Sequence, residues 1–253
     1  MKAPQIHLSL VVPCYNEETN LQKGVLDKIG NYTKSDNRFH EVIIVDDGST
    51  DASRKIISLR YLPKFPKFRL IENEHQGKAL AVITGIEEAK SPFVMFTDID
   101  LATPLEESEK MIQAFEDGHV LVIGSRAMKR QGAPWSRQLQ SKGFVFMRNM
   151  LIGLSGIQDT QCGFKGFRTD VARDIIKKMR VFTHQIHVQG ASVSAAFDLE
   201  FLFIARKSGY PIYEIPVKWR HAETKNVSLV KDSIETIRDL LKMRIYELQG
   251  KYT

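Results

Sequence analysis

The amino-acid sequence predicts a single α/β domain with a mostly parallel central sheet flanked by helices. Short apolar segments rich in β-forming residues alternate with longer segments of helical periodicity, a pattern typical of parallel sheets that are covered on both faces. The chain has 253 residues, of which 43% are hydrophobic and 26% charged, so it can bury the core that such a domain needs. No repeat or low-complexity tract interrupts it.

The first half alternates regularly between strand and helix. Buried strands are expected at Ile6–Val12, Glu41–Val45, Phe68–Ile71 and Phe93–Phe96. Helices are expected at Glu17–Ile29, after a cap at Thr50 or Asp51, and from Gly77 through Ile86. In parallel sheets the ligand crevice lies outside the carboxyl ends of the strands, so the residues that follow each strand are the first candidates for a site.

The second half is less regular. Strands are expected at Val120–Ile123 and Ile212–Val217, and Gln161–Phe167 is expected to be a loop entering a strand. Helices are expected at Thr169–Met179 and Phe197–Ala205. Apolar residues recur at helical spacing from Val230 to Leu248, and we expect this last helix to pack its apolar side on the core.

Acidic or polar clusters follow three of the predicted strands: Asn16-Glu17, Asp46-Asp47 and Asp98 with Asp100. One aspartate in a turn usually just bonds nearby backbone amides, but three clusters at one edge of a sheet predict a site. Two carboxylates one residue apart can share a hard divalent cation, and Mg²⁺ or Mn²⁺ is commonly bound by one or two carboxylates together with substrate phosphates. Asp98 and Asp100 are therefore the candidate metal ligands.

The net charge of +6 is unevenly distributed. No acidic residue lies between Asp117 and Asp159, whereas that interval contains Arg126, Lys129, Arg130, Arg137, Lys142 and Arg148. It predicts either a solvated basic face or a site for a polyanion such as nucleic acid, phospholipid headgroups or a phosphorylated substrate. Nucleic acid is disfavoured because the aromatic residues there are not arranged as a stacking platform and the acidic crevice would repel it.

Two other classes of protein are disfavoured by local sequence. The first strand leads into Pro13-Cys14-Tyr15-Asn16 without a GxGxxG motif, which argues against an NAD-dependent dehydrogenase. Cys14 and Cys162 lie far apart and in no CxxC arrangement, which argues against a disulfide scaffold or a zinc site and fits a reducing compartment.

Eight motifs in order resemble those of family 2 glycosyltransferases with the GT-A fold. The first five are VVPCYNEE (Val11–Glu18), VDDGSTD (Val45–Asp51), HQGKA (His75–Ala79), TDIDLATP (Thr97–Pro104) and GSR (Gly124–Arg126). The later QCGFKGF (Gln161–Phe167), FDLE (Phe197–Glu200) and IPVKW (Ile215–Trp219) resemble the branch of dolichyl-phosphate glucosyltransferases and polyprenyl-phosphate mannosyltransferases. The resemblance implies a Rossmann-like GT-A domain over residues 1–229, with a nucleotide-sugar donor half (1–126) and an acceptor half (127–229), followed by an amphipathic helix (230–253).

The resemblance also implies roles for residues of the donor half. Those expected to bind the nucleotide sugar are Pro13, Tyr15, Glu17, Asp47, Gly77, Lys78 and Asp98. Asp98 would face the ribose and the metal, and Asp100 would bind the metal that bridges the two donor phosphates, whereas Asp46 is expected to be structural. Some mannosyltransferase relatives have a glutamine where this chain has Ala102, and DIDLATP is closer to the glucosyltransferase form. The expected donor is therefore UDP-glucose before GDP-mannose.

The acceptor decides the mechanism. Residues expected to contact an acceptor phosphate are Arg126, Arg137, Ser141, Arg220 and Lys225. A polyprenyl or dolichyl phosphate is already an anion and can attack the anomeric carbon without a base, so that cations holding the two anions together suffice. The favoured reaction is inverting transfer of a hexose to such a phosphate. If the acceptor is instead a saccharide hydroxyl, Asp198 would be the catalytic base; a further alternative is a non-catalytic module that binds nucleotide sugar.

A lipid acceptor implies a membrane surface. No stretch of the sequence reaches the roughly 18 apolar residues that span a bilayer, and the N-terminus does not resemble a signal peptide. Phe144–Ile152, with Lys142 and Arg148, is a candidate interfacial segment. We therefore expect a cytoplasmic protein that is peripheral on the cytoplasmic face of a membrane.

Overall fold

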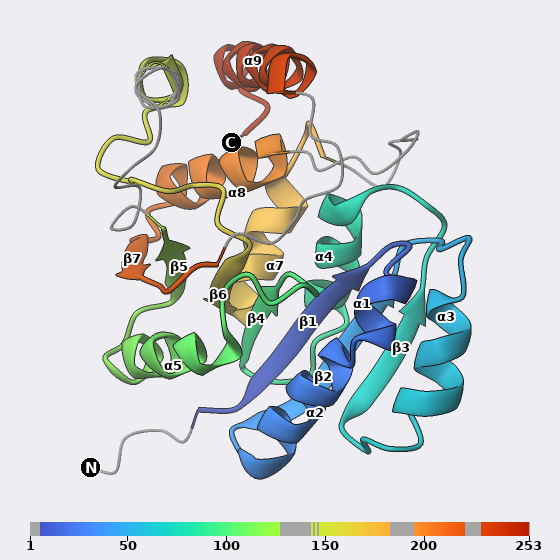
Figure 1. Ribbon diagram of the computed structural model, residues 1–253. Coiled ribbons are helices and arrows are strands. Elements are labelled where there is room, and N and C mark those ends of the chain that lie inside the picture. The colour runs from blue at the N-terminus through green and yellow to red at the C-terminus, as the bar shows by residue number, and fades with distance from the viewer. Residues whose placement is uncertain are drawn as a thin grey trace.

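The computed structural model describes residues 6–126, 143, 145, 147–182, 195–220 and 229–252. Within these residues seven strands form one sheet in the order β3-β2-β1-β4-β6-β5-β7 (Figure 1). The strands are β1 (Leu8–Cys14), β2 (Phe39–Asp46), β3 (Phe68–Glu72), β4 (Phe93–Thr97), β5 (Leu121–Ser125), β6 (Phe164–Arg168) and β7 (Tyr213–Pro216). All neighbouring pairs are parallel except those of β6, which runs antiparallel to both β4 and β5. The predicted, mostly parallel sheet is confirmed.

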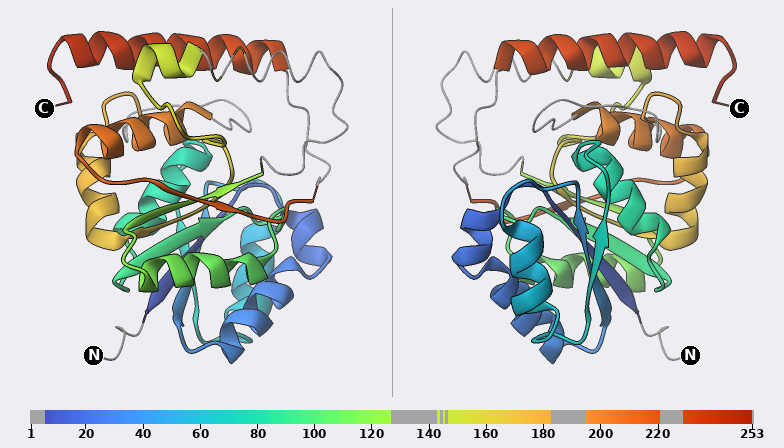
Figure 2. Two further views of the ribbon diagram at one scale, coloured as in Figure 1. Left: turned by 90° about the vertical axis from the view of Figure 1, so that its left-hand side faces the viewer. Right: turned by 90° about the vertical axis from the view of Figure 1, so that its right-hand side faces the viewer.

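Helices cover both faces of the sheet (Figures 1 and 2). One face carries α1 (Glu18–Gln22), α2 (Val25–Ser35), α3 (Ser53–Ile56) and α5 (Ser108–Glu116), and the other carries α4 (Lys78–Glu87), α7 (Thr169–Lys178) and α8 (Ala195–Lys207). Successive residues of β1 face opposite sides of the sheet. Leu10 and Val12 therefore pack in the core beneath α1, α2, α3 and α5, whereas Val11 packs in the core beneath α4, α7 and α8. The central strands are thus buried on both faces, which explains their continuous apolar sequence.

The first predicted helix is divided, which corrects the expectation of one helix over Glu17–Ile29. Gly24 lies between α1 and α2 with φ of 76°, a left-handed conformation that favours glycine and ends a helix. A second difference follows α3, where the helix widens into a π-helical turn at Ile57–Tyr61. There Tyr61 is buried, and its hydroxyl donates to the carbonyl of Leu21 at 2.8 Å.

The last helix, α9 (Leu229–Leu248), packs against α8 as expected. Leu240 and Met243 are its fully buried side chains among those described. In both side views α9 lies across the end of the molecule toward which β1 points (Figure 2). Among the described helices, α9 included, none combines the length and the apolar character that crossing a membrane would take.

Candidate functional site

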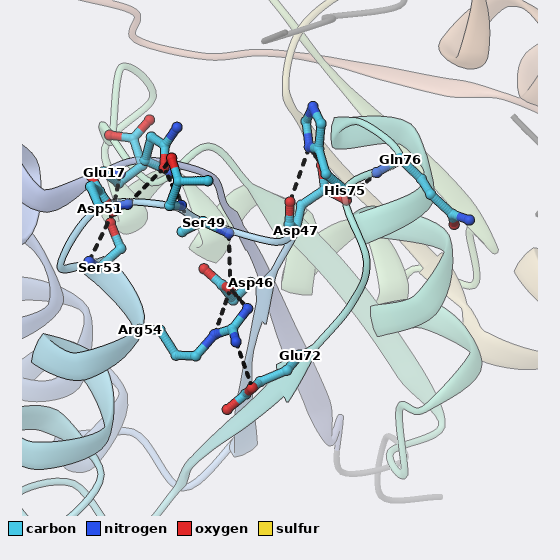
Figure 3. Close-up of polar contacts among 12 residues, drawn as sticks. Glu17, Asp46, Asp47, Ser49, Asp51, Ser53, Arg54, Glu72, His75 and Gln76 are labelled. Atoms are coloured by element: carbon cyan, nitrogen blue, oxygen red, sulfur yellow. Dashed lines mark hydrogen bonds and ion pairs between the residues drawn. The ribbon is translucent and has the colours of Figure 1, made fainter. Parts of the chain in front are cut away.

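The adjacent carboxylates at the end of β2 have different partners (Figure 3). Asp46 is fully buried and accepts a hydrogen bond from Nη2 of Arg54 at 2.8 Å and one from the backbone N–H of Ser49 at 3.2 Å. Arg54 also pairs with Glu72 at the end of β3, at 3.0 Å. Asp46 therefore ties the ends of two strands to the start of α3, which agrees with the structural role expected for it.

Asp47 instead fixes the loop that leads into α4. It is buried and accepts hydrogen bonds from the backbone N–H of Gln76 at 3.0 Å and of Gly77 at 2.8 Å. Nδ1 of His75 lies 2.8 Å from the same carboxylate, and the His75 ring stacks on Tyr15 with 4.0 Å between centroids. Three residues expected around the nucleotide, Tyr15, Asp47 and Gly77, thus lie together. The contact of Asp47 with a base or ribose stays a prediction.

The end of β1 is tied to the loop after β2. Asn16 has φ of 52°, uncommon for a residue other than glycine, and its side-chain oxygen accepts the backbone N–H of Thr50 at 2.8 Å. The backbone N–H of Glu17 donates to the hydroxyl of Ser53 at 2.8 Å (Figure 3). Pro13 is buried in β1 itself. The expected nucleotide-lining residues of this segment are therefore held on a fixed turn at the carboxyl edge of the sheet.

Asp98 and Asp100 follow β4 at the same edge. Asp98 forms an ion pair with Lys78, the first residue of α4. Asp100 accepts the backbone N–H of Ala102 at 2.9 Å, and Leu101 between them has φ of 52°. Burial raises the pKa of Asp100 and the neighbouring charge of Asp98 adds to the rise, although the hydrogen bond from Ala102 opposes it. A cation bound at this pair would favour the charged form of both carboxylates.

The two carboxylates fit a hard divalent cation. In the described part of the chain, no three histidine, cysteine, aspartate or glutamate side chains converge as a complete protein cage for a metal. Two carboxylates supplemented by substrate phosphates are a common arrangement for Mg²⁺ or Mn²⁺. The amino terminus of α4, where Lys78 meets Asp98, adds a favourable place for those phosphates.

β6 brings a buried charge pair to this site that the sequence did not indicate. Lys165 is 1% exposed, forms an ion pair with Asp198 of α8 at 2.8 Å and donates to the carbonyl of Cys162 at 2.5 Å. Burial raises the pKa of Asp198, while the positive charges of Lys165 and Lys78 act against that rise. The role of Asp198 as a base stays a prediction. The available signal was Lys165, which stands between apolar residues in the sequence Cys162–Phe167.

Gly163, the residue that precedes β6, approaches Asp98 closely. A Cβ atom at Gly163 would lie 2.2 Å from Oδ2 of Asp98, so only glycine leaves room for that carboxylate. Cys162 beside it is buried with a free thiol, as is Cys14. The turn after β4, the first residue of α4 and the residue before β6 therefore meet at the Asp98 carboxylate.

The residues expected at the acceptor phosphate are only partly described. Arg126 donates to both oxygens of Asp159, at 2.6 Å and 2.9 Å, and its guanidinium lies 5.7 Å from the ring centroid of Trp219. Arg220 is exposed, and its backbone N–H donates to the carbonyl of Ala102 at 2.8 Å, which places it beside the Asp98–Asp100 turn. The other three, Arg137, Ser141 and Lys225, lie outside the described residues.

The interpretation of Arg148 as part of a basic or interfacial surface is wrong. Its side chain is buried and donates to the carbonyls of Leu154 and Ile157, at 3.2 Å and 2.7 Å. A guanidinium can satisfy several carbonyls that would otherwise be buried without donors. Arg148 therefore holds the loop after the helical residues 147–152, and its charge is not available to a ligand on the surface.

The chain matches a known sequence family and, along nearly its whole length, relatives within it. The sequence model described as glycosyl transferase family 2 matches residues 9–176. A dolichyl-phosphate beta-glucosyltransferase of Trichomonas vaginalis is 33% identical over 262 residues, which cover 98% of this chain and 76% of that protein. The human dolichyl-phosphate beta-glucosyltransferase is 33% identical over 267 residues, which cover 99% of this chain and 78% of that protein.

A solved structure shares the fold. Glucosyl-3-phosphoglycerate synthase from Mycobacterium tuberculosis, in complex with Mn²⁺, uridine diphosphate and glucosyl-3-phosphoglycerate, superposes with a TM-score of 0.65. The two sequences are 17% identical, and the match covers 94% of this chain and 79% of that one. Likeness at this identity is a likeness of fold, and it confirms the GT-A architecture that the motifs predict.

Proposed function

Because this chain belongs to glycosyl transferase family 2, we propose that it transfers glucose from UDP-glucose to dolichyl phosphate or a related polyprenyl phosphate. The product is a β-linked lipid-phosphate sugar, formed with inversion at the anomeric carbon. The identity of at least 30% with dolichyl-phosphate glucosyltransferases along nearly the whole chain supports the acceptor class. The DIDLATP sequence with Ala102 supports glucose over mannose and UDP over GDP.

The geometry around Asp98 carries the donor assignment. The turn after β4 supplies two carboxylates, and Lys78 at the amino terminus of α4 contacts the first of them. Negative and positive charge therefore lie side by side at this point. A nucleoside diphosphate and a divalent cation require this combination, because the helix terminus favours phosphate and the carboxylates favour the cation. Mg²⁺ or Mn²⁺ held by Asp98 and Asp100 would stabilise the negative charge of the departing diphosphate.

The acceptor phosphate needs no base in this reaction. One of its oxygens forms a bond to the anomeric carbon while the bond from that carbon to the diphosphate oxygen breaks and UDP departs. The task of the protein is to hold two anions together. Arg220 lies beside the Asp98–Asp100 turn through its bond to Ala102, and the guanidinium of Arg126 is oriented by Asp159. We assign both arginines to the acceptor phosphate, together with Arg137, Ser141 and Lys225.

One observation favours a second candidate function, transfer to a saccharide hydroxyl. Burial raises the pKa of Asp198, as a general base requires. Its ion pair with Lys165 argues the other way, because that ammonium binds the oxygen that would take the proton. Replacing Asp198→Asn separates the two readings: a loss of at least roughly 100-fold in kcat supports a base, whereas a small loss supports the phosphate acceptor.

Substitution of Asp100 tests the donor assignment. We expect Asp100→Ala to reduce Mn²⁺-dependent transfer from UDP-glucose by about 100-fold or more, since charge stabilisation at the diphosphate is lost. Asp170→Ala is the matched control, because Asp170 is an exposed aspartate at the start of α7, on another element. Near-normal transfer by Asp100→Ala would show that Asp100 does not bind a required metal. If the wild type showed neither transfer nor donor hydrolysis, a non-catalytic module that binds nucleotide sugar would be favoured.

A lipid-linked acceptor also sets where the protein works. We propose that it is peripheral on the cytoplasmic face of a membrane, where nucleotide sugars and the phosphate end of the lipid are both accessible. Fractionation of cells expressing the chain, followed by a salt wash of the membranes, tests this: release by salt is expected, and retention through a carbonate wash would contradict peripheral attachment.

A further inference from the structure

The outer surface of α9 and the turn after it combines apolar and basic side chains. Among the side chains described for residues 236–252, the exposed large apolar ones are Leu241, Ile245 and Leu248, at 48%, 51% and 74%. They are spaced i, i+4 and i+7, which places them on one stripe of a helix. The exposed charged residues of the same segment are all basic: Arg238, Lys242, Arg244 and Lys251. A helix stripe left exposed in this way needs an explanation.

The acidic side chains of this segment lie on the inner side. Asp239 is buried and forms long ion pairs with Arg238, at 3.9 Å, and Lys242, at 3.8 Å. Glu247 is half-buried between Arg244, at 2.5 Å, and Lys207 of α8, at 3.6 Å. Among the side chains described for residues 236–252, the carboxylates are therefore the less exposed charges and the cations the more exposed ones. A helix that only needed solubility would expose both signs, because mixed surface charge serves that purpose.

The location of α9 relates this surface to the candidate site. α9 and the helical residues 147–152 both lie at the end of the molecule toward which the parallel strands point (Figures 1 and 2). Met150 of that second helical segment is 67% exposed and adds a further apolar side chain at this end. The turns that carry Asp47 and Asp98 lie at the carboxyl ends of β2 and β4. The candidate site and α9 therefore lie at the same end of the sheet.

We propose that the outer face of α9, with Leu241, Ile245 and Leu248 at its centre, docks on a bilayer surface that carries anionic headgroups. An amphipathic helix with a basic polar side lies in the plane of such an interface, with its apolar stripe among the acyl chains. The basic residues around it are attracted by anionic lipid. The inference rests on the proposed function, which supplies a lipid-linked acceptor, and it adds the surface that brings this acceptor to the site.

A second copy of the chain fits this face less well than a membrane. An isologous contact would bring four basic residues of one copy toward the same four of the other, and the described residues 236–252 hold no exposed carboxylate that could pair with them across the interface. Like charges across an interface disfavour association. Anionic lipid supplies both the apolar phase and the opposite charge, and it is the occupant that the sorting of charge predicts.

Vesicle co-sedimentation of the full chain tests the proposal. We expect binding to phosphatidylcholine vesicles that contain phosphatidylserine, weaker binding to pure phosphatidylcholine, and weakening by salt. The double substitution Leu241→Glu and Ile245→Glu should reduce the binding to anionic vesicles by roughly ten- to a hundredfold, because two apolar side chains that would enter the bilayer are lost. Leu59→Glu is the matched control, since Leu59 is 69% exposed in the π-helical turn after α3, remote from α9.

Activity measurements separate this proposal from the proposed function. Transfer to a short-chain, water-soluble polyprenyl phosphate should be unchanged in the double variant, whereas transfer to a long-chain acceptor in anionic vesicles should fall with the binding. Equal vesicle binding by the wild type and the double variant would overturn the proposal, as would a change from dimer to monomer without a change in vesicle binding. If the wild type does not use the short-chain acceptor, the proposed function fails, and vesicle binding still decides the docking surface.

Discussion

The substitution Gly163→Ala should disturb the candidate site while leaving the fold intact. The new Cβ would lie 2.2 Å from Oδ2 and 2.6 Å from Cγ of Asp98, whereas ordinary contact begins at 3.4 Å. The carboxylate must therefore retreat by roughly 1 Å, judged from contact distances in packed interiors. Because the clash falls on the end of a partly exposed side chain and not on backbone, Asp98 can rotate away while β6 stays in place.

The expected effect is large on activity and small on stability. A misplacement of about 1 Å in a catalytic constellation can cost on the order of 100-fold in rate, so we expect kcat/KM for Mn²⁺-dependent transfer to fall by about that factor. The free energy of unfolding should fall by only about 1 kcal/mol, the centre of the range for single substitutions. Steady-state kinetics with varied Mn²⁺ and urea denaturation measure the two quantities.

Gly143→Ala is the control for the added methyl group. A Cβ there meets no atom within 4 Å, and the residue is helical, so activity and stability should be unchanged or slightly improved. Full activity of Gly163→Ala would show that the Asp98 carboxylate is not needed where the structure places it. Unfolding of the variant would show that backbone, and not the carboxylate, gives way. Either result refutes the reasoning.

Three further predictions concern buried charges. Lys165→Met leaves Asp198 unpaired and should lower the free energy of unfolding by about 3–5 kcal/mol. The double variant with Asp198→Asn should recover most of this loss. If urea denaturation showed that the two substitutions lower stability additively, the pairing would be contradicted. Burial acts to raise the pKa of Asp159, but the hydrogen bonds and charge of Arg126 outweigh it and hold that pKa below its ordinary value. The ionised Asp159 therefore stabilises the folded state fully above about pH 4, and this contribution is lost as pH falls through the lower folded pKa. The stability difference between the wild type and Asp159→Asn should therefore be largest near pH 7 and shrink toward pH 3; a constant difference would refute it. Arg148→Met should lower the free energy of unfolding by about 1–3 kcal/mol, because the carbonyls of Leu154 and Ile157 lose their donor. It should leave vesicle binding unchanged; weaker vesicle binding would show that Arg148 contacts the membrane surface.

The sequence predicted the strands and their polar ends because both depend on local pattern. The continuous apolar segment of β4 and the Asp98-Ile99-Asp100 triplet that follows it are adjacent in the chain, so their order alone places two carboxylates at the sheet edge. Motif order then indicated the GT-A fold, since eight short patterns in one order are far more specific than any one of them. The helix boundary at Gly24 was also present in the sequence, as a glycine inside an otherwise helical pattern.

Only the tertiary structure decided which charges face the site and which are buried. Arg148 belongs to a basic stretch of sequence, yet it serves the carbonyls of Leu154 and Ile157 because those carbonyls are buried beside it. Lys165 and Asp198 come from β6 and α8 and meet only when the antiparallel strand enters the sheet between β4 and β5. The physical reason is the same in each case. Periodicity records whether a residue is buried, whereas the partner that compensates a buried charge comes from a distant segment and is fixed by strand order and packing.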